Sequence, residues 1–201
     1  MYVNPTEGSR TLPYDTPARA AATLEDALNW AYETGTGTPM VIQLSTGVYP
    51  VAGTLILNRG LVIRGGGALP DETVLLGTGT SRVAYVAHPR AVLENVTLTN
   101  GYVDSSNGAL TDRGAGLYLT NGTVRNCLIT GNAVRNNCGG GALIYDTGTL
   151  EGCTIRNNQA IYSSAQVANG GGIYFYHGGT ISNCLVEANE AVWGAGMWFE
   201  L

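Results

Sequence analysis

The sequence contains no lysine, and all ten of its cationic side chains are arginines scattered between Arg10 and Arg156. Charged residues make up only 12% of the chain, and the formal net charge is -5. Proteins that bind nucleic acid or anionic lipid usually carry a basic stripe on their surface. Because this chain has none, we expect neither nucleic acid nor an anionic membrane surface among its partners.

Long apolar runs are also missing. No segment approaches the roughly 18 consecutive apolar residues of a transmembrane helix, so we expect no membrane span. The first residues lack the charged and then apolar organisation of a signal peptide. The last residue, Leu201, closely follows a repeated block with no polar cap, which a solenoid needs at each end. We therefore expect the chain to continue beyond Leu201 in a longer protein.

Histidine and cysteine are scarce, with two and four residues. There is no Cys-x-x-Cys motif, and His88 lies far from His177, so we expect no zinc site or other bound metal. Three cysteines, Cys127, Cys153 and Cys184, occupy the same position of a repeat, which predicts a column with a spacing of about 4.8 Å. Such a column allows either a disulfide between neighbours or a stack of free thiols that pack as small hydrophobes, and the free thiols are the simpler arrangement.

Glycine, in contrast, is abundant, and much of it lies in four repeated blocks. Each block opens on a Gly-x-Gly triplet followed by alternating apolar residues, and the blocks start at Gly114, Gly139, Gly170 and Gly194. The first three blocks continue into Gly-Thr, an aliphatic residue and one of the three cysteines. A repeat of this length, made of short strands and turns, predicts a solenoid.

Residues 1–45 are not repetitive and predict an N-terminal cap with a short strand, a loop, a helix at about 17–33 and a first strand. Thr23 followed by Asp26 resembles a capping box for that helix. Residues 46–201 predict the solenoid itself, with six to seven rungs, the last one incomplete. Its first strands are expected at Thr54–Leu57, Leu61–Arg64, Val74–Leu76, Val83–Val86 and Val92–Leu98.

Two groups of motifs resemble a known family. The segments at Tyr2–Pro5, Ala22–Leu28, Gly47–Tyr49 and Leu61–Gly65 look like the opening of right-handed parallel β-helix proteins of the pectate-lyase-like superfamily. The later blocks, such as Gly171–Asn189, resemble the repeats of polymorphic outer membrane proteins and related autotransporter passengers. The resemblance implies an all-β fold, a right-handed parallel β-helix with an N-terminal capping helix. It also implies an extracellular or bacterial cell-surface location.

Alternation within each block predicts which columns point inward. One inward column holds Leu117, Ala142, Ile173 and Met197, and another holds Leu119, Ile144, Phe175 and Phe199. Asparagine forms a further column at Asn132, Asn158 and Asn189, where side-chain amides can bridge one rung to the next. Ligand binding by these asparagines is the alternative to a structural ladder.

The outward positions between the inward columns are rich in aromatic residues. One column holds Tyr118, Leu143, Tyr174 and Trp198, and the next holds Thr120, Tyr145, Tyr176 and Glu200. The aromatic residues among them would form a flat, exposed stripe that can stack on sugar rings or pack against another protein. Tyrosine is also simply favoured on exposed strands, so a purely structural role stays open.

Catalytic candidates are few. Asn121, Asp146 and His177 share a turn position, and a carboxylate beside an imidazole can perform general acid–base catalysis. Asp104, Asp112 and Arg113 flank the long turn between two rungs and are the remaining candidates for a calcium or substrate contact. The resemblance implies, for an enzyme, a calcium site of several carboxylates or paired carboxylates across a sugar. This sequence has no Asp-Asp pair.

These observations favour a non-catalytic extracellular scaffold, adhesin-like or in contact with a polysaccharide or a cell-surface protein through Tyr118, Tyr145, Tyr174, Tyr176 and Trp198. A polysaccharide lyase or glycoside hydrolase is the alternative, and a structural spacer without a ligand is the second. No cofactor is expected, apart from the calcium ion that the enzyme alternative would bring.

Overall fold

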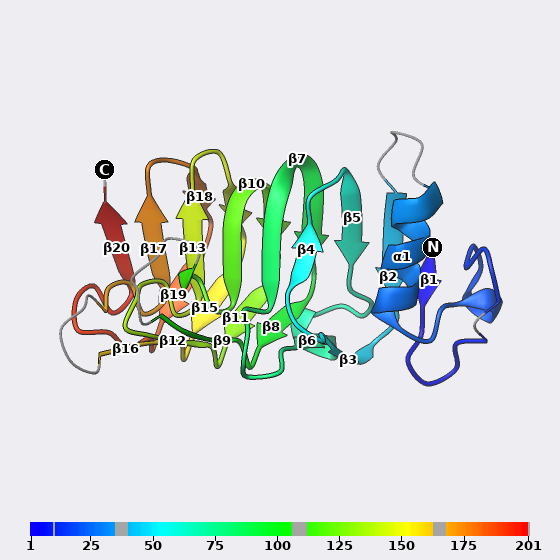
Figure 1. The fold of residues 1–201 in the computed structure, drawn as a ribbon, viewed down its shortest axis with the longest axis horizontal. Helices are drawn as coiled ribbons and strands as arrows, with labels where there is room; N and C mark the ends of the chain where they lie inside the picture. The colour runs from blue at the N-terminus through cyan, green and yellow to red at the C-terminus, as the bar shows by residue number, and fades with distance from the viewer. Residues whose placement is uncertain (10, 35–39, 106–111, 163–167, 201) are drawn as a thin grey trace.

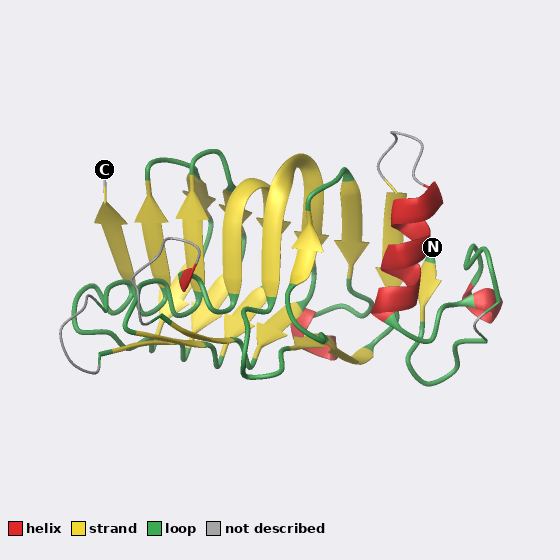
Figure 2. Cartoon of the chain, viewed as in Figure 1, coloured by secondary structure: helices red, strands yellow, loops and turns green. Residues whose placement is uncertain are grey.

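The chain folds into a mostly-β parallel solenoid with one short α-helix near its N-terminus (Figure 1). The computed structural model describes residues 1–9, 11–34, 40–105, 112–162 and 168–200. Figure 2 shows the strands standing side by side from the helix to the C-terminal end. Within the described ranges, no helix has the length and apolar character needed to cross a membrane.

Three sheets form the walls of the solenoid. The largest has 11 strands, namely β1 (Tyr2–Val3), β2 (Met40–Leu44), β4 (Leu55–Leu57), β5 (Leu61–Arg64), β7 (Ala84–Glu94), β10 (Leu117–Arg125), β13 (Ala142–Tyr145), β14 (Thr149–Glu151), β17 (Ile173–Tyr176), β18 (Thr180–Ser182) and β20 (Met197–Glu200). The second consists of β3 (Gly47–Pro50), β6 (Thr73–Leu76), β8 (Thr97–Thr99), β11 (Leu128–Thr130), β15 (Thr154–Arg156) and β19 (Leu185–Glu187). The third consists of β9 (Tyr102–Asp104), β12 (Ala133–Arg135) and β16 (Gln159–Ile161).

A complete turn passes through all three sheets, as in β10, β11 and β12. The solenoid has about 4 such turns, rather than the six to seven that the repeats predict. The third sheet begins only at β9, and the fourth turn reaches it through a single bridge between Gln159 and Glu190. Strands before β7 belong to turns with fewer sides, which the spacing of apolar residues does not distinguish from complete turns.

The N-terminal helix is shorter than the expected helix at 17–33. Pro17–Arg19 form an isolated 3₁₀ turn (η1), and the α-helix α1 covers only Leu24–Thr34. The residues between them are extended because Ala21 bridges to Val3 and donates its backbone N–H to the carbonyl of Tyr2. The helix begins after Thr23, whose hydroxyl accepts a hydrogen bond of 3.1 Å from the backbone N–H of Asp26.

The strands expected before the glycine blocks form with small changes. The segments expected at 83–86 and at the start of 92–98 join into the long strand β7, and Asn95 separates it from β8 with a left-handed φ of 55°. A further 3₁₀ turn, η2 (Pro70–Glu72), precedes β6. Asparagine tolerates left-handed backbone better than most residues, which explains its recurrence at such corners.

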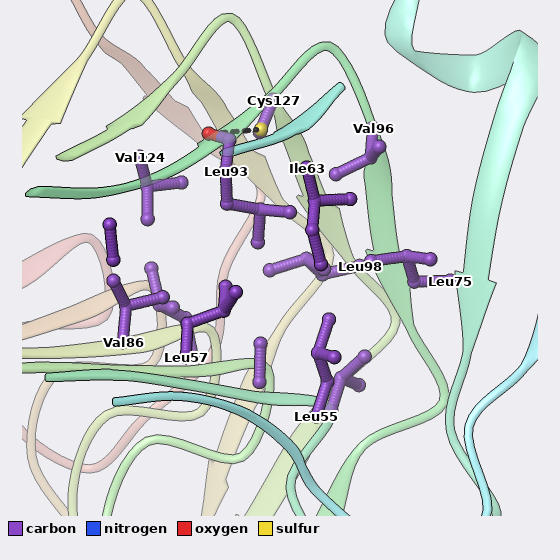
Figure 3. Close-up of a cluster of buried hydrophobic side chains, with 14 of the residues drawn as sticks. Leu55, Leu57, Ile63, Leu75, Val86, Leu93, Val96, Leu98, Val124 and Cys127 are labelled. Carbon is purple, nitrogen blue, oxygen red and sulfur yellow. Dashed lines mark hydrogen bonds between the residues drawn. The ribbon is translucent and has the colours of Figure 1, made fainter. Parts of the chain in front are cut away.

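The inward columns are confirmed. Leu117, Ala142 and Ile173 pair in register and are fully buried, as are the neighbouring Leu119 and Ile144. Figure 3 shows side chains from successive turns meeting in one interior. Their counterparts on β20 are exposed, because no described turn lies over them. Stacking like residues on like residues therefore builds one continuous apolar interior along the coil.

The glycine triplets permit close contact between turns. Their first glycines have left-handed φ values of 69°, 75°, 63° and 57°, a region that glycine enters without steric cost. The third glycine serves packing instead. A Cβ on Gly141 would lie 2.5 Å from the carbonyl oxygen of Gly172 on the next turn, a distance that no side chain can tolerate. The triplet thus combines a tight turn with an unusually close approach of two backbones.

The asparagine ladder is also confirmed. The Asn158 side chain donates to the carbonyls of Ile129 and Arg156 at 2.9 and 3.0 Å, and to Asn189 Oδ1 at 3.0 Å. Its own Oδ1 accepts from the backbone and side chain of Asn132 at 3.1 and 3.0 Å. Asn158 is fully buried. Both ends of its amide are therefore occupied, which a purely structural role requires.

We expect Asn158→Asp to destabilise the fold by about 3–5 kcal/mol at neutral pH, because a buried carboxylate would face carbonyl oxygens that now accept N–H donors. The loss should fall toward about 1–2 kcal/mol at acidic pH, where the acid is protonated and can donate one hydrogen bond. Urea unfolding followed by circular dichroism at both pH values measures the difference.

The neighbouring Asn157→Asp is the matched control. Asn157 is exposed and has a left-handed φ of 55°, which aspartate tolerates. Its effect should stay within about 0.5 kcal/mol. A loss at position 158 that is equally small, or that does not depend on pH, would contradict the ladder.

Candidate functional site

The outer face of the first sheet carries two columns rich in aromatic residues. Register places Tyr85, Tyr118, Leu143, Tyr174 and Trp198 in one column across β7, β10, β13, β17 and β20. The adjacent column places Tyr145, Tyr176 and Glu200 side by side. We call Tyr118, Tyr145, Tyr174, Tyr176 and Trp198 the aromatic surface. Their stacking from turn to turn is as the repeats predict.

These aromatic columns are less exposed than the sequence predicts. Tyr174 is only 1% exposed and Leu143 is fully buried, whereas Tyr118, Tyr145, Tyr176 and Trp198 are half-buried. Leu143 and Tyr174 form a small apolar cluster with Cys138, separate from the main interior. The segment that contains Cys138 connects two turns and lies against this face. Tyr174 is therefore a supporting residue rather than an exposed contact.

The rings contact one another both across turns and within one strand. Tyr85 and Tyr118 stack with centroids 5.0 Å apart, Tyr145 and Tyr176 with centroids 5.6 Å apart, and Tyr174 and Tyr176 with centroids 5.9 Å apart. Aromatic contacts of this kind add about 0.5–1.5 kcal/mol each beyond the burial of area. Much of the aromatic surface is therefore packed ring against ring.

Two arginines lie over these rings. The guanidinium carbon of Arg82 is 4.9 Å from the Tyr118 ring centroid, and that of Arg113 is 4.8 Å from the Tyr174 centroid. Arg113 Nε donates to Asn137 Oδ1 at 2.9 Å. Its Nη1 is buried and has no hydrogen-bond partner among the described residues.

Carboxylates and hydroxyls complete the polar rim. Tyr174 donates its hydroxyl hydrogen to Glu200 Oε2. Burial, and then this hydrogen bond, raise the pKa of Tyr174 well above its ordinary value, so the phenol stays a donor. Burial lowers the pKa of Arg82, although Tyr118 and Asp112 act in the opposite direction. The rim thus offers donors and acceptors beside aromatic rings.

The candidate acid–base pair is not assembled. Asp146 and His177 occupy equivalent turn positions, both with a φ of 61°. The His177 ring packs on Tyr176 at a centroid distance of 4.0 Å, and within the described ranges no hydrogen bond or ion pair joins it to Asp146. Asp146 is exposed. Equal sequence intervals therefore give equal turn positions, but no such bond between these two groups accompanies them.

The residues of the long turn are divided between two surfaces. Asp104 lies on β9 and forms an ion pair of 3.4 Å with Arg135 on β12, in the third sheet. Arg113 lies instead on the aromatic surface, and Asp112 interacts with Arg82. Residues 106–111 of the turn lie outside the described residues. Within the part of the chain that is described, no three His, Cys, Asp or Glu side chains gather as a metal site would require.

The repeat pattern predicts Glu200 beside Tyr176, but the sequence analysis does not place Arg82, Tyr85 or Cys138 as neighbours of the aromatic surface. Tyr85 had a signal, since Val83–Val86 is an alternating strand like those of the glycine blocks. Cys138 and Arg82 lie in connecting segments, where the repeat pattern gives no register. Their positions depend on how each connection folds back onto the sheet.

A separate group of charged residues lies on the same sheet, at the C-terminal end of β7. Glu94 is 6% exposed and forms ion pairs with Arg64 on one side and Arg125 on the other. Burial acts to raise the pKa of Glu94, but the hydrogen bonds and charges of both arginines outweigh it and lower that pKa overall. Because both carboxylate oxygens are occupied, this group joins three turns rather than offering a binding site.

Residues 82–200, more than half of the chain, match the family described as right-handed β-helix region. The chain belongs to this family, and its coil is accordingly right-handed. A search of curated proteins found no significant match. The comparisons give no support for the resemblance to polymorphic outer membrane proteins and autotransporter repeats.

Two solved structures are similar in fold. The pectin methyl esterase of the rice weevil has a TM-score of 0.41 and 16% identity over 89% of this chain, which spans 65% of that enzyme. The pectin methylesterase from Aspergillus niger has a TM-score of 0.43 and 13% identity. The match covers 100% of this chain and 80% of the Aspergillus enzyme. At these values the likeness carries no argument about activity.

We expect Glu94→Gln to destabilise the protein by about 1–2 kcal/mol at neutral pH, since both arginines are about half exposed and solvent screens part of the interaction. The folded-state pKa of Glu94 is depressed, so its contribution is present above the unfolded pKa of about 4.3 and is lost as pH falls through the folded value. The difference in unfolding free energy between the native protein and the variant should therefore disappear at acidic pH.

Unfolding free energies measured across the pH range give this gap. The exposed Glu151→Gln, one position along the same column, is the control and should change stability by less than about 0.5 kcal/mol. A Glu94→Gln effect that stays constant with pH would contradict the ion pairs.

Proposed function

We propose that this chain is a non-catalytic β-helix scaffold that contacts an extended polysaccharide through its aromatic surface. The observation that carries the proposal is the row of half-buried rings, Tyr118, Tyr145, Tyr176 and Trp198, on one face of a rigid sheet. The apolar faces of sugar rings stack on such platforms. Successive turns repeat every 4.8 Å or so, which is close to the length of one sugar unit in an extended chain.

The polar groups around the rings support the same function. Arg113 and Glu200 place a guanidinium group and a carboxylate beside Tyr174. A sugar needs both donors and acceptors for its hydroxyl groups, together with an apolar platform. The surface also suits a protein partner, because aromatic residues and arginine dominate protein interfaces. A cell-surface protein is therefore the second class of ligand.

The non-catalytic part of the proposal rests on the candidate residues. Asp146 and His177 are not joined, and Asp104 is engaged by Arg135. The acid–base hypothesis pairs a carboxylate with an imidazole, and among the described residues no hydrogen bond or ion pair joins these two side chains. The extracellular or bacterial cell-surface location is part of the proposal and is supported by the family resemblance alone.

The test is binding to immobilised polygalacturonate, a neutral galactan and a mucin glycan, measured by retention of the purified chain. At least one polysaccharide should bind. Tyr176→Ala together with Trp198→Ala should weaken that binding about tenfold, because two stacking contacts of about 0.5–1.5 kcal/mol are lost. Thermal unfolding should confirm that the variant is folded.

Tyr102→Ala is the matched control, since Tyr102 is also half-buried but lies on β9 in the third sheet. It should leave binding unchanged. Absence of binding to every polysaccharide would overturn the glycan proposal and leave a protein partner or a spacer. Release of an unsaturated or shortened product would overturn the non-catalytic part and favour a lyase or hydrolase.

A further inference from the structure

Asparagine followed by glycine is prone to spontaneous deamidation, because glycine leaves the backbone nitrogen unhindered as it approaches the asparagine side chain. The proposed function assigns no role to such pairs. The described residues contain three of them, at Asn100–Gly101, Asn121–Gly122 and Asn169–Gly170. Their local chemistry is identical, so a difference in reactivity between them must come from the fold.

The Asn121–Gly122 pair lies inside β10, between the half that pairs with β13 and the half that pairs with β14. The backbone N–H of Gly122 donates to Oδ1 of Asn121 at 2.8 Å. Gly122 has a left-handed φ of 83°, and a Cβ there would lie 2.6 Å from the carbonyl oxygen of His88. A backbone conformation that requires glycine therefore holds this nitrogen against the side-chain amide of the preceding asparagine.

The glycine nitrogens of the other two pairs are bound elsewhere. The backbone N–H of Gly101 donates to Oδ1 of Asn132 on the next turn at 2.8 Å. The backbone N–H of Gly170 donates to the carbonyl oxygen of Trp193 at 3.0 Å. In both pairs, ring closure would first have to break a hydrogen bond between two turns of the solenoid. In Asn121–Gly122 the nitrogen already contacts the group with which it would react.

Exposure to solvent ranks the three asparagines differently. Asn100 is exposed, Asn121 is half-buried and Asn169 is buried. If access to solvent governed the reaction, Asn100 would react fastest. If proximity governs it, Asn121 should react fastest, because groups held in a near-attack geometry do not pay the entropy of coming together. The two explanations therefore predict different sites.

We propose that Asn121 is a site of self-modification, at which the backbone nitrogen of Gly122 attacks the side-chain amide carbon of Asn121. The nitrogen gives its proton to hydroxide, the N–Cγ bond forms, and the side-chain nitrogen leaves as ammonia. The product of this step is a five-membered succinimide. Water then adds to one of the two imide carbonyls and opens the ring to aspartate or isoaspartate. Overall, one amide and one water molecule become one carboxylate and one ammonium ion.

The surroundings of β10 also predict which product forms. Isoaspartate inserts an extra methylene into the backbone and would lengthen the strand at this point. Strand β10 pairs with β7 on one side, and with β13 and β14 on the other, before and after Asn121. Because an extra backbone atom would shift that register, we expect aspartate to predominate in the folded chain. The modification then adds one negative charge at the turn position that Asn121 shares with Asp146 and His177.

The absence of lysine makes the test direct, because trypsin cleaves this chain only after arginine. Cleavage after Arg113 and Arg125 gives peptide 114–125, in which Asn121 is the only side chain that can deamidate. The folded chain should be incubated at mildly alkaline pH, digested briefly at mildly acidic pH and analysed by tandem mass spectrometry. Fragment ions locate the modified residue in the other peptides, including 91–113, where Asn100 and Asn107 occur together.

Asn121 should deamidate at least about tenfold faster than Asn100 and Asn169 in the folded chain. The matched control is the same chain unfolded in guanidinium chloride, where the three identical pairs should react at similar rates. Asn121→Gln should leave peptide 114–125 unmodified, because its longer side chain would have to close a larger ring. Circular dichroism checks that this variant is folded.

A folded-state rate at Asn100 or Asn169 that equals or exceeds the rate at Asn121 would overturn the proposal. So would an Asn121 that stays intact in the folded chain while it reacts in the unfolded one. Isoaspartate as the main folded-state product, identified by its resistance to an aspartate-specific protease, would overturn the predicted direction of ring opening. Polysaccharide binding is not needed for any of these outcomes, so they are independent of the proposed function.

Discussion

Stacking of each turn on the next, in register, is the constraint on which the rest of this structure depends. In-register parallel pairing places equivalent residues one strand spacing apart, so whatever lies at a position in one turn must tolerate its counterpart in the next. The third position of the triplet is the most restricted, because the carbonyl of Gly172 approaches Gly141 too closely for any residue other than glycine. The buried asparagines satisfy it by polarity, since one amide both donates and accepts along the axis.

The same constraint organises the outer surface. Residues that point outward on successive turns form columns as regular as those inside, which is why tyrosines meet tyrosines and Glu94 lies between two arginines. In the column around Glu94, the carboxylate and both arginines are paired with one another, which leaves no carboxylate oxygen for a ligand. The aromatic surface is different, because it combines rings, a hydroxyl, a carboxylate and arginine guanidinium groups. That difference separates a structural charge cluster from a candidate binding surface.

Much of the fold could be predicted from the sequence because the solenoid is built from local repeats. The inward columns, the asparagine ladder and the thiol column follow from equal spacing alone, and the structure confirms them. The expected helix at 17–33 is too long because local propensity carries no information about the bridge between Ala21 and Val3. This bridge holds the segment before α1 in an extended conformation. The expected number of turns is too high because a turn that passes through two sheets has the same apolar spacing in sequence as one that passes through three.

The candidate site shows where this kind of prediction ends. Its rows of tyrosines follow from the repeat, but the burial of Tyr174 and the separation of Asp104 from Arg113 do not. The sequence by itself determined the register, because identical residues recur at intervals that only one stacking satisfies. Only the tertiary structure decided which parts of that surface are covered. The segments that connect the turns have unequal lengths and no repeat, so the way they pack against the sheet depends on contacts that no local pattern encodes.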